Sequence, residues 1–187
     1  MKTLTYTDLR AMLEAETARL NALIETEGAK KACNYRKTLT ACANCEKLVV
    51  ACGDKFKADS ELYTADRETP VPNYGTVAEQ ALFYLMTHRA TGKSAKNGYD
   101  HTLRGRRVEY KACLSASSKN TPYTPTDRGI YRDVLLVNTC GVWYIPADEA
   151  KDLTEKYGRF KHNADYSEYV PDDLRDLCDL LTALIYG

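Results

Sequence analysis

One stretch decides the expected fold, residues 98–111, which read GYDHTLRGRRVEYK. Alternating apolar and polar residues on either side of an Arg-Gly turn predict two strands, over residues 99–103 and 107–114, joined as a hairpin. If the chain turns on Arg104-Gly105, or on a four-residue loop from Leu103 to Arg106, facing residues have numbers that sum to 209, so Asp100 faces Glu109. A period of two also puts Glu109 and Lys111 on one face of the second strand.

Two facing carboxylates repel each other, which destabilises a plain sheet. The pair makes sense if a divalent cation bridges it, because Mg²⁺ prefers hard carboxylate oxygens. The alternative is two solvated acids on an exposed hairpin face. The chain holds one other acid-x-Lys tripeptide, Glu149-Ala150-Lys151, but it falls in a predicted helix, where positions i and i+2 do not share a face.

Outside the hairpin, hydrophobic spacing predicts helices over residues 8–27, from Thr76 to about residue 89, from Pro146 to about residue 157, and after Pro171. Short apolar runs over residues 134–137 and 142–145 predict two buried strands. The last helix is expected to bury Leu174, Leu177, Cys178, Leu181, Leu184 and Ile185. Prolines and a glycine in residues 66–75 mark a boundary. We therefore expect an α/β or α+β fold with an N-terminal helical region over residues 1–70 and a second domain over residues 71–187.

The motifs resemble those of the PD-(D/E)xK nuclease superfamily. The resemblance rests on Gly98-Tyr99-Asp100, on Val108-Glu109-Tyr110-Lys111, and on the preceding helix that carries Glu79. It covers about residues 75–150 and implies a restriction-endonuclease-like core, a mixed sheet flanked by helices. Tyr99 stands where the superfamily's name-giving proline would be, and the segment before it is short for a first strand.

The resemblance implies a role for each residue of the motif. Asp100 and Glu109 would bind Mg²⁺, with the Tyr110 carbonyl as a third ligand, and Lys111 would orient or activate the attacking water. Glu79 matches a helix-borne acid that completes the metal site in many members, and its alternative is an ordinary surface acid. Hydrolysis of a phosphodiester needs a metal to lower the pKa of water and to balance charge on the phosphate.

Charge is unevenly distributed, although 26 basic residues balance 26 acidic ones. Residues 93–132 carry nine basic and three acidic groups, whereas residues 133–187 carry five and eleven. The basic segment flanks the expected site, where such groups contact phosphates without reading sequence. The candidate DNA contacts are Lys93, Lys96, Arg104, Arg106, Arg107, Lys119, Arg128 and Arg132.

Seven cysteines include the group Cys33, Cys42, Cys45 and Cys52. The spacing of Cys42, Cys45, Val49, Cys52 and Phe56 is that of a buried helix stripe packed on the helix of residues 8–27, with Cys33 before the helix start. The pair Cys42 and Cys45 also has zinc-knuckle spacing, which leaves a four-cysteine zinc site as the alternative.

No apolar run is long enough for a membrane span or signal sequence, so we expect a cytosolic protein with no membrane partner. The expected function is that of a Mg²⁺-dependent endonuclease on double-stranded DNA, of restriction or homing type, acting as a homodimer or higher homo-oligomer. The alternatives are a Holliday-junction or repair nuclease of the same fold, and a zinc-stabilised DNA-binding module without catalysis.

Overall fold

The computed structural model divides the chain into two compact units, residues 1–92 with 114–117, and residues 93–113 with 118–187. It describes residues 3–4, 11, 14–15, 17–19, 21–22, 25–26, 32–53, 62–63, 74–88, 101–115 and 132–187. None of the helices in those ranges is long and apolar enough to cross a membrane. The predicted boundary near residue 70 stays a prediction.

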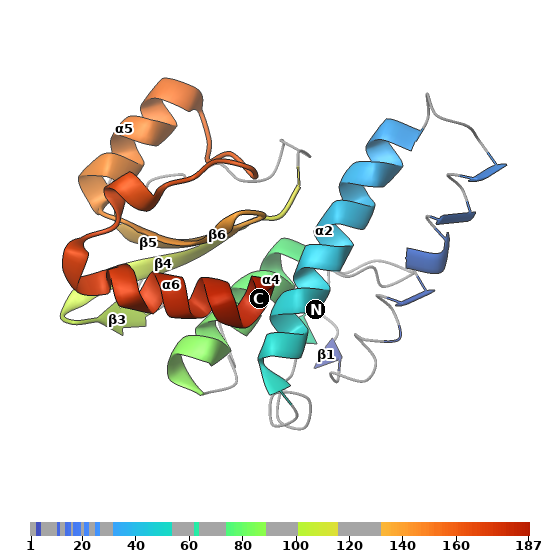
Figure 1. Ribbon diagram of the computed structural model, residues 1–187, viewed down its shortest axis with the longest axis horizontal. Coiled ribbons are helices and arrows are strands. Elements are labelled where there is room, and N and C mark those ends of the chain that lie inside the picture. The colour runs from blue at the N-terminus through green and yellow to red at the C-terminus, as the bar shows by residue number, and fades with distance from the viewer. Residues whose placement is uncertain are drawn as a thin grey trace. The chain divides into compact units, whose positions relative to one another are not determined.

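The first unit is mainly helical (Figure 1). Its described helices are α2 (Ala32–Ala51) and α4 (Tyr74–Thr87), and two short strands, β1 (Thr3–Leu4) and β2 (Leu62–Tyr63), pair antiparallel. The described residues between 11 and 26 are helical, as predicted. Helices α2 and α4 pack together, and the Cys52 thiol lies 3.4 Å from the Ala81 carbonyl oxygen.

The cysteines of α2 form the predicted buried stripe. Cys42, Cys45 and Val49 are fully buried and Cys52 nearly so. The Cys42 Sγ lies 3.0 Å from the Thr17 Oγ1, so the stripe also contacts one of the described helical residues between 11 and 26. The prediction that Cys33 precedes the helix was wrong, since α2 begins at Ala32 and includes it. The first turns of α2 are mostly polar, so the apolar spacing gave no sign that the helix starts this early. Phe56 lies outside the described residues.

We expect alkylation with maleimide at pH 7.5 to modify Cys140 well before the stripe cysteines Cys42, Cys45 and Cys52. Cys140 is exposed, whereas burial raises the pKa of Cys52 to about 12 from an ordinary 9.0 and raises that of Cys45 further. Because only the thiolate is nucleophilic, buried thiols react slowly. Site-resolved mass spectrometry over time checks the order.

Because their pKa values are raised, the Cys45 and Cys52 thiols hold their protons more tightly in the folded chain than in the unfolded chain. The stripe's contribution to stability should therefore be intact below about pH 9 and be lost as the pH rises towards 12. Equal labelling rates at all four cysteines would contradict the buried stripe. So would stoichiometric zinc that survives dialysis and is lost on Cys42→Ser.

The second unit is built on a four-stranded mixed sheet in the order β3-β4-β5-β6. Its strands are β3 (His101–Leu103), β4 (Arg106–Cys113), β5 (Asp133–Asn138) and β6 (Gly141–Ile145). β4 and β5 run parallel, while the two outer pairs are antiparallel. The predicted α/β class is therefore confirmed, and both predicted strand pairs are present.

The β3–β4 hairpin turns on two residues, Arg104 and Gly105, which have φ of 48° and 81°. Positive φ at both central positions is the type I′ geometry that matches the twist of paired strands. The ladder pairs His101 with Val108, Thr102 with Arg107, and Leu103 with Arg106, so each pair sums to 209. The predicted register is confirmed for these three pairs.

Helices α5 (Ala147–Tyr157) and α6 (Asp172–Tyr186) lie on opposite sides of this sheet (Figure 1). Asp133 helps to start α5, because its Oδ1 accepts a hydrogen bond of 2.9 Å from the Ala147 N–H. Gly158, with a φ of 71°, ends the helix in the left-handed conformation. A short 3₁₀ helix, Ser167–Tyr169, precedes α6.

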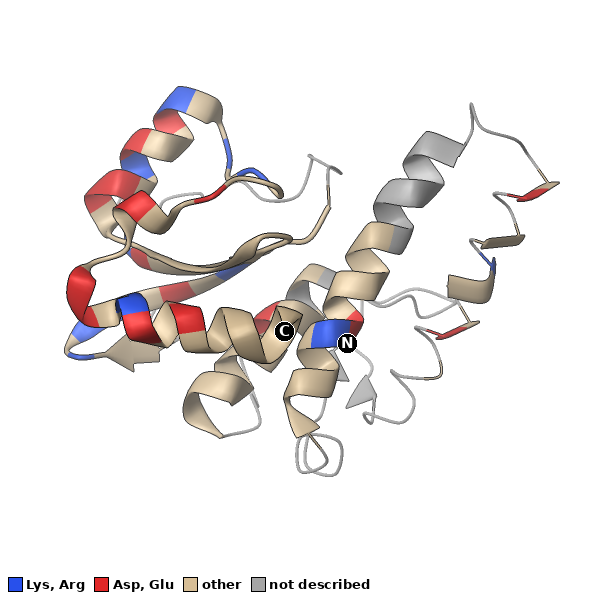
Figure 2. Cartoon of the chain, viewed as in Figure 1, with Lys and Arg blue, Asp and Glu red and all other residues tan. Residues whose placement is uncertain are grey.

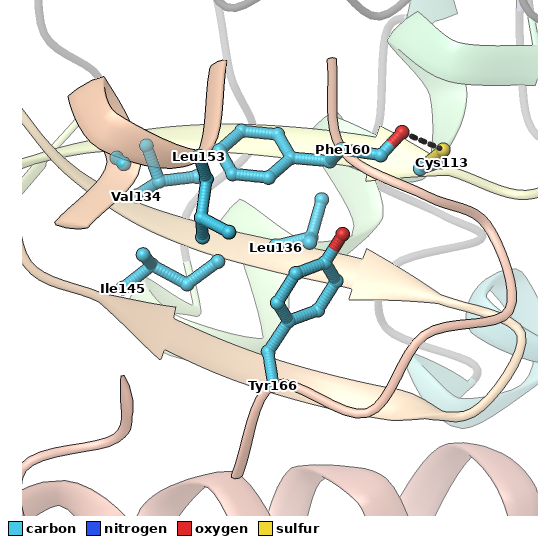
Figure 3. Close-up of a cluster of buried hydrophobic side chains, with 8 residues drawn as sticks. Cys113, Val134, Leu136, Ile145, Leu153, Phe160 and Tyr166 are labelled. Carbon is cyan, nitrogen blue, oxygen red and sulfur yellow. Dashed lines mark hydrogen bonds between the residues drawn. The ribbon is translucent and has the colours of Figure 1, made fainter. Parts of the chain in front are cut away.

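A hydrophobic core fills the space between α5 and the sheet (Figure 3). Side chains from three strands, α5 and the following loop pack there: Cys113, Val134, Leu136, Ile145, Ala150, Leu153, Phe160 and Tyr166. Val134 and Leu136 are the ladder neighbours of Glu109 and Lys111. Since ladder neighbours share a face, Glu109 and Lys111 lie on the α5 side of the sheet.

Helix α6 runs from the β3–β4 turn to the β5–β6 turn. At its start Asp173 pairs with Arg104, and at its end the Tyr186 hydroxyl donates to the Asn138 carbonyl oxygen over 2.6 Å. It buries Leu174, Cys178, Leu181 and Ile185, as predicted. The prediction that Leu184 is buried was wrong, because this residue is 52% exposed. The face of α6 that packs against the sheet is narrower than the apolar face that the sequence pattern predicts. Leu177 is only half-buried.

Asn138, at the end of β5, is a fully buried polar residue that joins three segments. Its Oδ1 accepts hydrogen bonds from the Cys140 and Gly141 N–H groups and from the Trp143 indole, at 2.9, 3.1 and 2.9 Å. Its amide donates to the Lys161 and Ala164 carbonyls, at 3.2 and 2.7 Å. This residue therefore fixes the loop after α5 against the β5–β6 turn.

Candidate nuclease site

The acid and the base of the predicted motif meet on β4. The Lys111 Nζ lies 2.7 Å from the Glu109 Oε1, and the two side chains are 21% and 26% exposed. The predicted sharing of one face is therefore confirmed. Tyr110, on the other face, is buried, and its hydroxyl lies 3.0 Å from His101 Nδ1. The ion pair is thus partly shielded but still reached by solvent.

The decoy tripeptide behaves differently. Glu149 and Lys151 lie on α5 and are both exposed. Residues two apart on a helix point about 200° apart, so no joint site forms between them. Substitutions of Glu149 and Lys151 are therefore matched controls for substitutions of Glu109 and Lys111.

Arg107 shares the face of Glu109 and Lys111, because it precedes Glu109 by two residues in the same strand. The three charged side chains follow one another at intervals of about 6.6–6.8 Å along the strand. Sequence reasoning placed Arg107 only among the hairpin's basic residues. The alternation of side chains along a strand could have distinguished Arg107, which shares the face of Glu109, from Arg104 and Arg106.

The other two hairpin arginines lie towards the opposite side. Arg104 pairs with Asp173 of α6 through an Nη1–Oδ2 distance of 3.0 Å. Arg106 interacts with the Tyr144 hydroxyl, which also donates to Asp133. Burial and Asp133 raise the pKa of Tyr144 and the Arg106 guanidinium lowers it, with burial dominant. Arg107 is thus the one of the three that lies beside the Glu109–Lys111 pair.

Asp100, the second predicted metal ligand, lies outside the described residues. It directly precedes β3, and its number and that of Glu109 sum to 209, like the three observed pairs. Its place opposite Glu109 stays a prediction. Among the described residues, no three acidic, histidine or cysteine side chains gather as a metal site.

Glu79 lies on α4 in the first unit and is half-buried. Its role in the metal site stays a prediction, as does that of the Tyr110 carbonyl. Arg132 is only 7% exposed, and its role as a DNA contact stays a prediction. Four candidate DNA contacts fall outside the described residues: Lys93, Lys96, Lys119 and Arg128.

In comparisons with protein-family models, with curated proteins and with solved structures, nothing matches this chain.

Proposed function

We propose that this protein is a Mg²⁺-dependent DNA endonuclease with a restriction-endonuclease-like core. The observation that carries the proposal is the Glu109–Lys111 pair, 2.7 Å apart on one face of β4, with β3 paired in the register that the motif requires. The mixed sheet with a helix on each side is also what such a core needs. Because a duplex has two strands to cut, the proposal includes a homodimer or higher homo-oligomer.

The residues present fit a hard divalent cation. Glu109 supplies a carboxylate that solvent can reach, and Asp100 is the second carboxylate of the proposed site. The Tyr110 carbonyl and Glu79 are the further proposed ligands. Bound Mg²⁺ would lower the pKa of a water molecule and balance charge on the scissile phosphate.

Lys111 is the proposed catalytic cation. Its ammonium is held at the carboxylate of Glu109, and so would lie beside any metal which that carboxylate binds. A positive charge there can orient the attacking water and stabilise the negative charge that develops on the phosphate. The partial burial of both side chains strengthens these interactions relative to bulk water.

The test is cleavage of supercoiled plasmid by the purified full-length chain in Mg²⁺, with and without EDTA. The proposal predicts nicked or linear product in Mg²⁺ and none with EDTA. DNA binding without cutting, together with one zinc per chain, would instead support the non-catalytic module. Cutting of four-way junctions but not of plasmid would identify a resolving nuclease of the same fold.

We expect Arg107→Ala to weaken DNA binding more than Arg104→Ala or Arg106→Ala. Only Arg107 shares the face of the proposed site, and removing one phosphate contact should make the plot of log affinity against log salt shallower by about 0.9. Fluorescence anisotropy on duplex DNA in Ca²⁺, across a salt series, measures this slope. Equal slopes for the three variants would contradict the assignment of Arg107 to the DNA-facing side.

A further inference from the structure

A second basic cluster lies where the overall charge is negative. The acidic excess of residues 133–187 is distributed along α5 and α6 (Figure 2). At the end of α5, however, three exposed side chains group together: Lys156, Tyr157 and Lys161. We call these three residues the α5 cluster. The acidic total of the whole segment hid it from sequence reasoning.

Two ammonium groups share one exposed aromatic ring in this cluster. The Lys156 and Lys161 Nζ atoms lie over the Tyr157 ring, 5.1 and 4.6 Å from its centroid, and the tyrosine is 47% exposed. Within the described part of the chain, neither ammonium has a carboxylate partner. Two positive charges therefore share one ring, and no described carboxylate is paired with either of them.

The backbone under the cluster is held rigidly. Phe160 is buried in the core, and its carbonyl accepts a hydrogen bond from the Cys113 thiol (Figure 3). The Lys161 N–H donates to the Tyr166 hydroxyl over 2.7 Å, and its carbonyl accepts from Asn138. A fixed loop presents its side chains without paying the entropy of ordering on binding.

The α5 cluster is on the side of the sheet that carries the β4 charges. Phe160 packs against the face formed by Val134 and Leu136, the ladder neighbours of Glu109 and Lys111. The Cys113 thiol that contacts the Phe160 carbonyl belongs to a residue two positions beyond Lys111 on the same strand. The cluster and the β4 charges therefore lie on the same side of the sheet, the side that α5 covers.

We infer that the α5 cluster binds a single-stranded segment of nucleic acid, with a base stacked on Tyr157 and the flanking phosphates on Lys156 and Lys161. An exposed ring with two lysine ammonium groups over it suits a strand with unpaired bases. On binding, a base would take the place of an ammonium group on the ring, and the flexible lysine side chains would turn to the neighbouring phosphates. In a paired duplex the base faces are covered by their neighbours. The inference goes beyond cleavage and needs no metal at Glu109.

The experiment measures binding of a fluorescein-labelled single strand and of the matching duplex by anisotropy, without metal, in a Glu109→Gln background. The double variant Lys156→Ala/Lys161→Ala should make the plot of log single-strand affinity against log salt shallower by about 1.4, because each lost phosphate contact removes about 0.7 from the slope. Tyr157→Ala should lower single-strand affinity by about 5- to 150-fold and leave the salt slope unchanged, since stacking carries no charge.

The matched control is Lys47→Ala/Lys151→Ala, which removes the same charge from exposed positions outside the cluster. It should leave the slope within error of the parent chain. The inference is overturned if the cluster variants bind the single strand like this control, or if Tyr157→Ala weakens the duplex as much as the single strand. This experiment measures binding and not cutting, so its result tests the α5 cluster even if the cleavage assay shows no nuclease activity.

Discussion

Lys111→Ala is expected to lower the rate of DNA cleavage by at least about 100-fold while leaving DNA affinity within about threefold of the parent chain. In the proposed mechanism the Lys111 side chain, paired with Glu109, would serve the chemical step, and a positioned acid, base or cation of this kind contributes about 10²–10⁴ in rate. Single-turnover cleavage at saturating protein, with binding measured separately in Ca²⁺, separates the two quantities.

The matched control for Lys111→Ala is Lys151→Ala, the lysine of the α5 decoy, which should cut at the parent rate. Asp100→Ala should abolish cutting as Lys111→Ala does, and Glu79→Ala should lose less, since its place in the site is the least constrained. A Lys111→Ala chain that cuts within a fewfold of the parent would mean that the catalytic residues lie elsewhere.

Asn138→Leu is expected to destabilise the second unit by about 3–5 kcal/mol. The substitution leaves a buried and a part-buried backbone N–H group, the Trp143 indole and two carbonyls without their partner, and each buried hydrogen bond left unmade costs about 1–3 kcal/mol before relaxation. For a protein of this length the melting temperature should fall by about 6–20 °C. Thermal unfolding followed by far-UV circular dichroism measures the shift.

The control for Asn138→Leu is Asn163→Leu, an exposed asparagine in the loop that Asn138 holds. Its effect should stay within about 0.5 kcal/mol, because surface substitutions away from such networks rarely cost more. If both variants melted at the same temperature, the buried network would not be what holds the loop to the sheet.

The sheet could be predicted because its signals are local. The Arg104-Gly105 turn set the register of β3 and β4, and the short apolar runs predicted β5 and β6. Pro146 and Gly158, at the ends of α5, are residues whose backbone preferences start and stop a helix. The limits of elements that begin or end at such residues can be predicted from the local sequence alone.

The features that sequence reasoning missed depend on contacts between distant segments. Asn138 lies outside the two apolar runs that predicted β5 and β6, and its burial follows from the loop at Lys161 and Ala164 folding back over it. Leu184 has the spacing of a core residue, but α6 does not press that flank against the sheet. The α5 cluster includes Lys161, which reaches the Tyr157 ring only because Phe160 is anchored between them.

Within the candidate site, the sequence could predict the face shared by Glu109 and Lys111, since strand alternation alone determines it. It could not predict that Arg104 would be held by Asp173, because that pair joins residues 69 positions apart. Only the tertiary fold distinguishes the three neighbouring arginines by the partners that they find.

The most direct test of the nuclease proposal compares the parent chain with Glu109→Gln, purified in the same way, on one supercoiled plasmid in Mg²⁺. Glutamine keeps the size of the side chain but removes the charge that would hold the metal. The proposal predicts cutting by the parent chain and none by Glu109→Gln over the same time. Equal cutting by both chains, or cutting by neither, would contradict it.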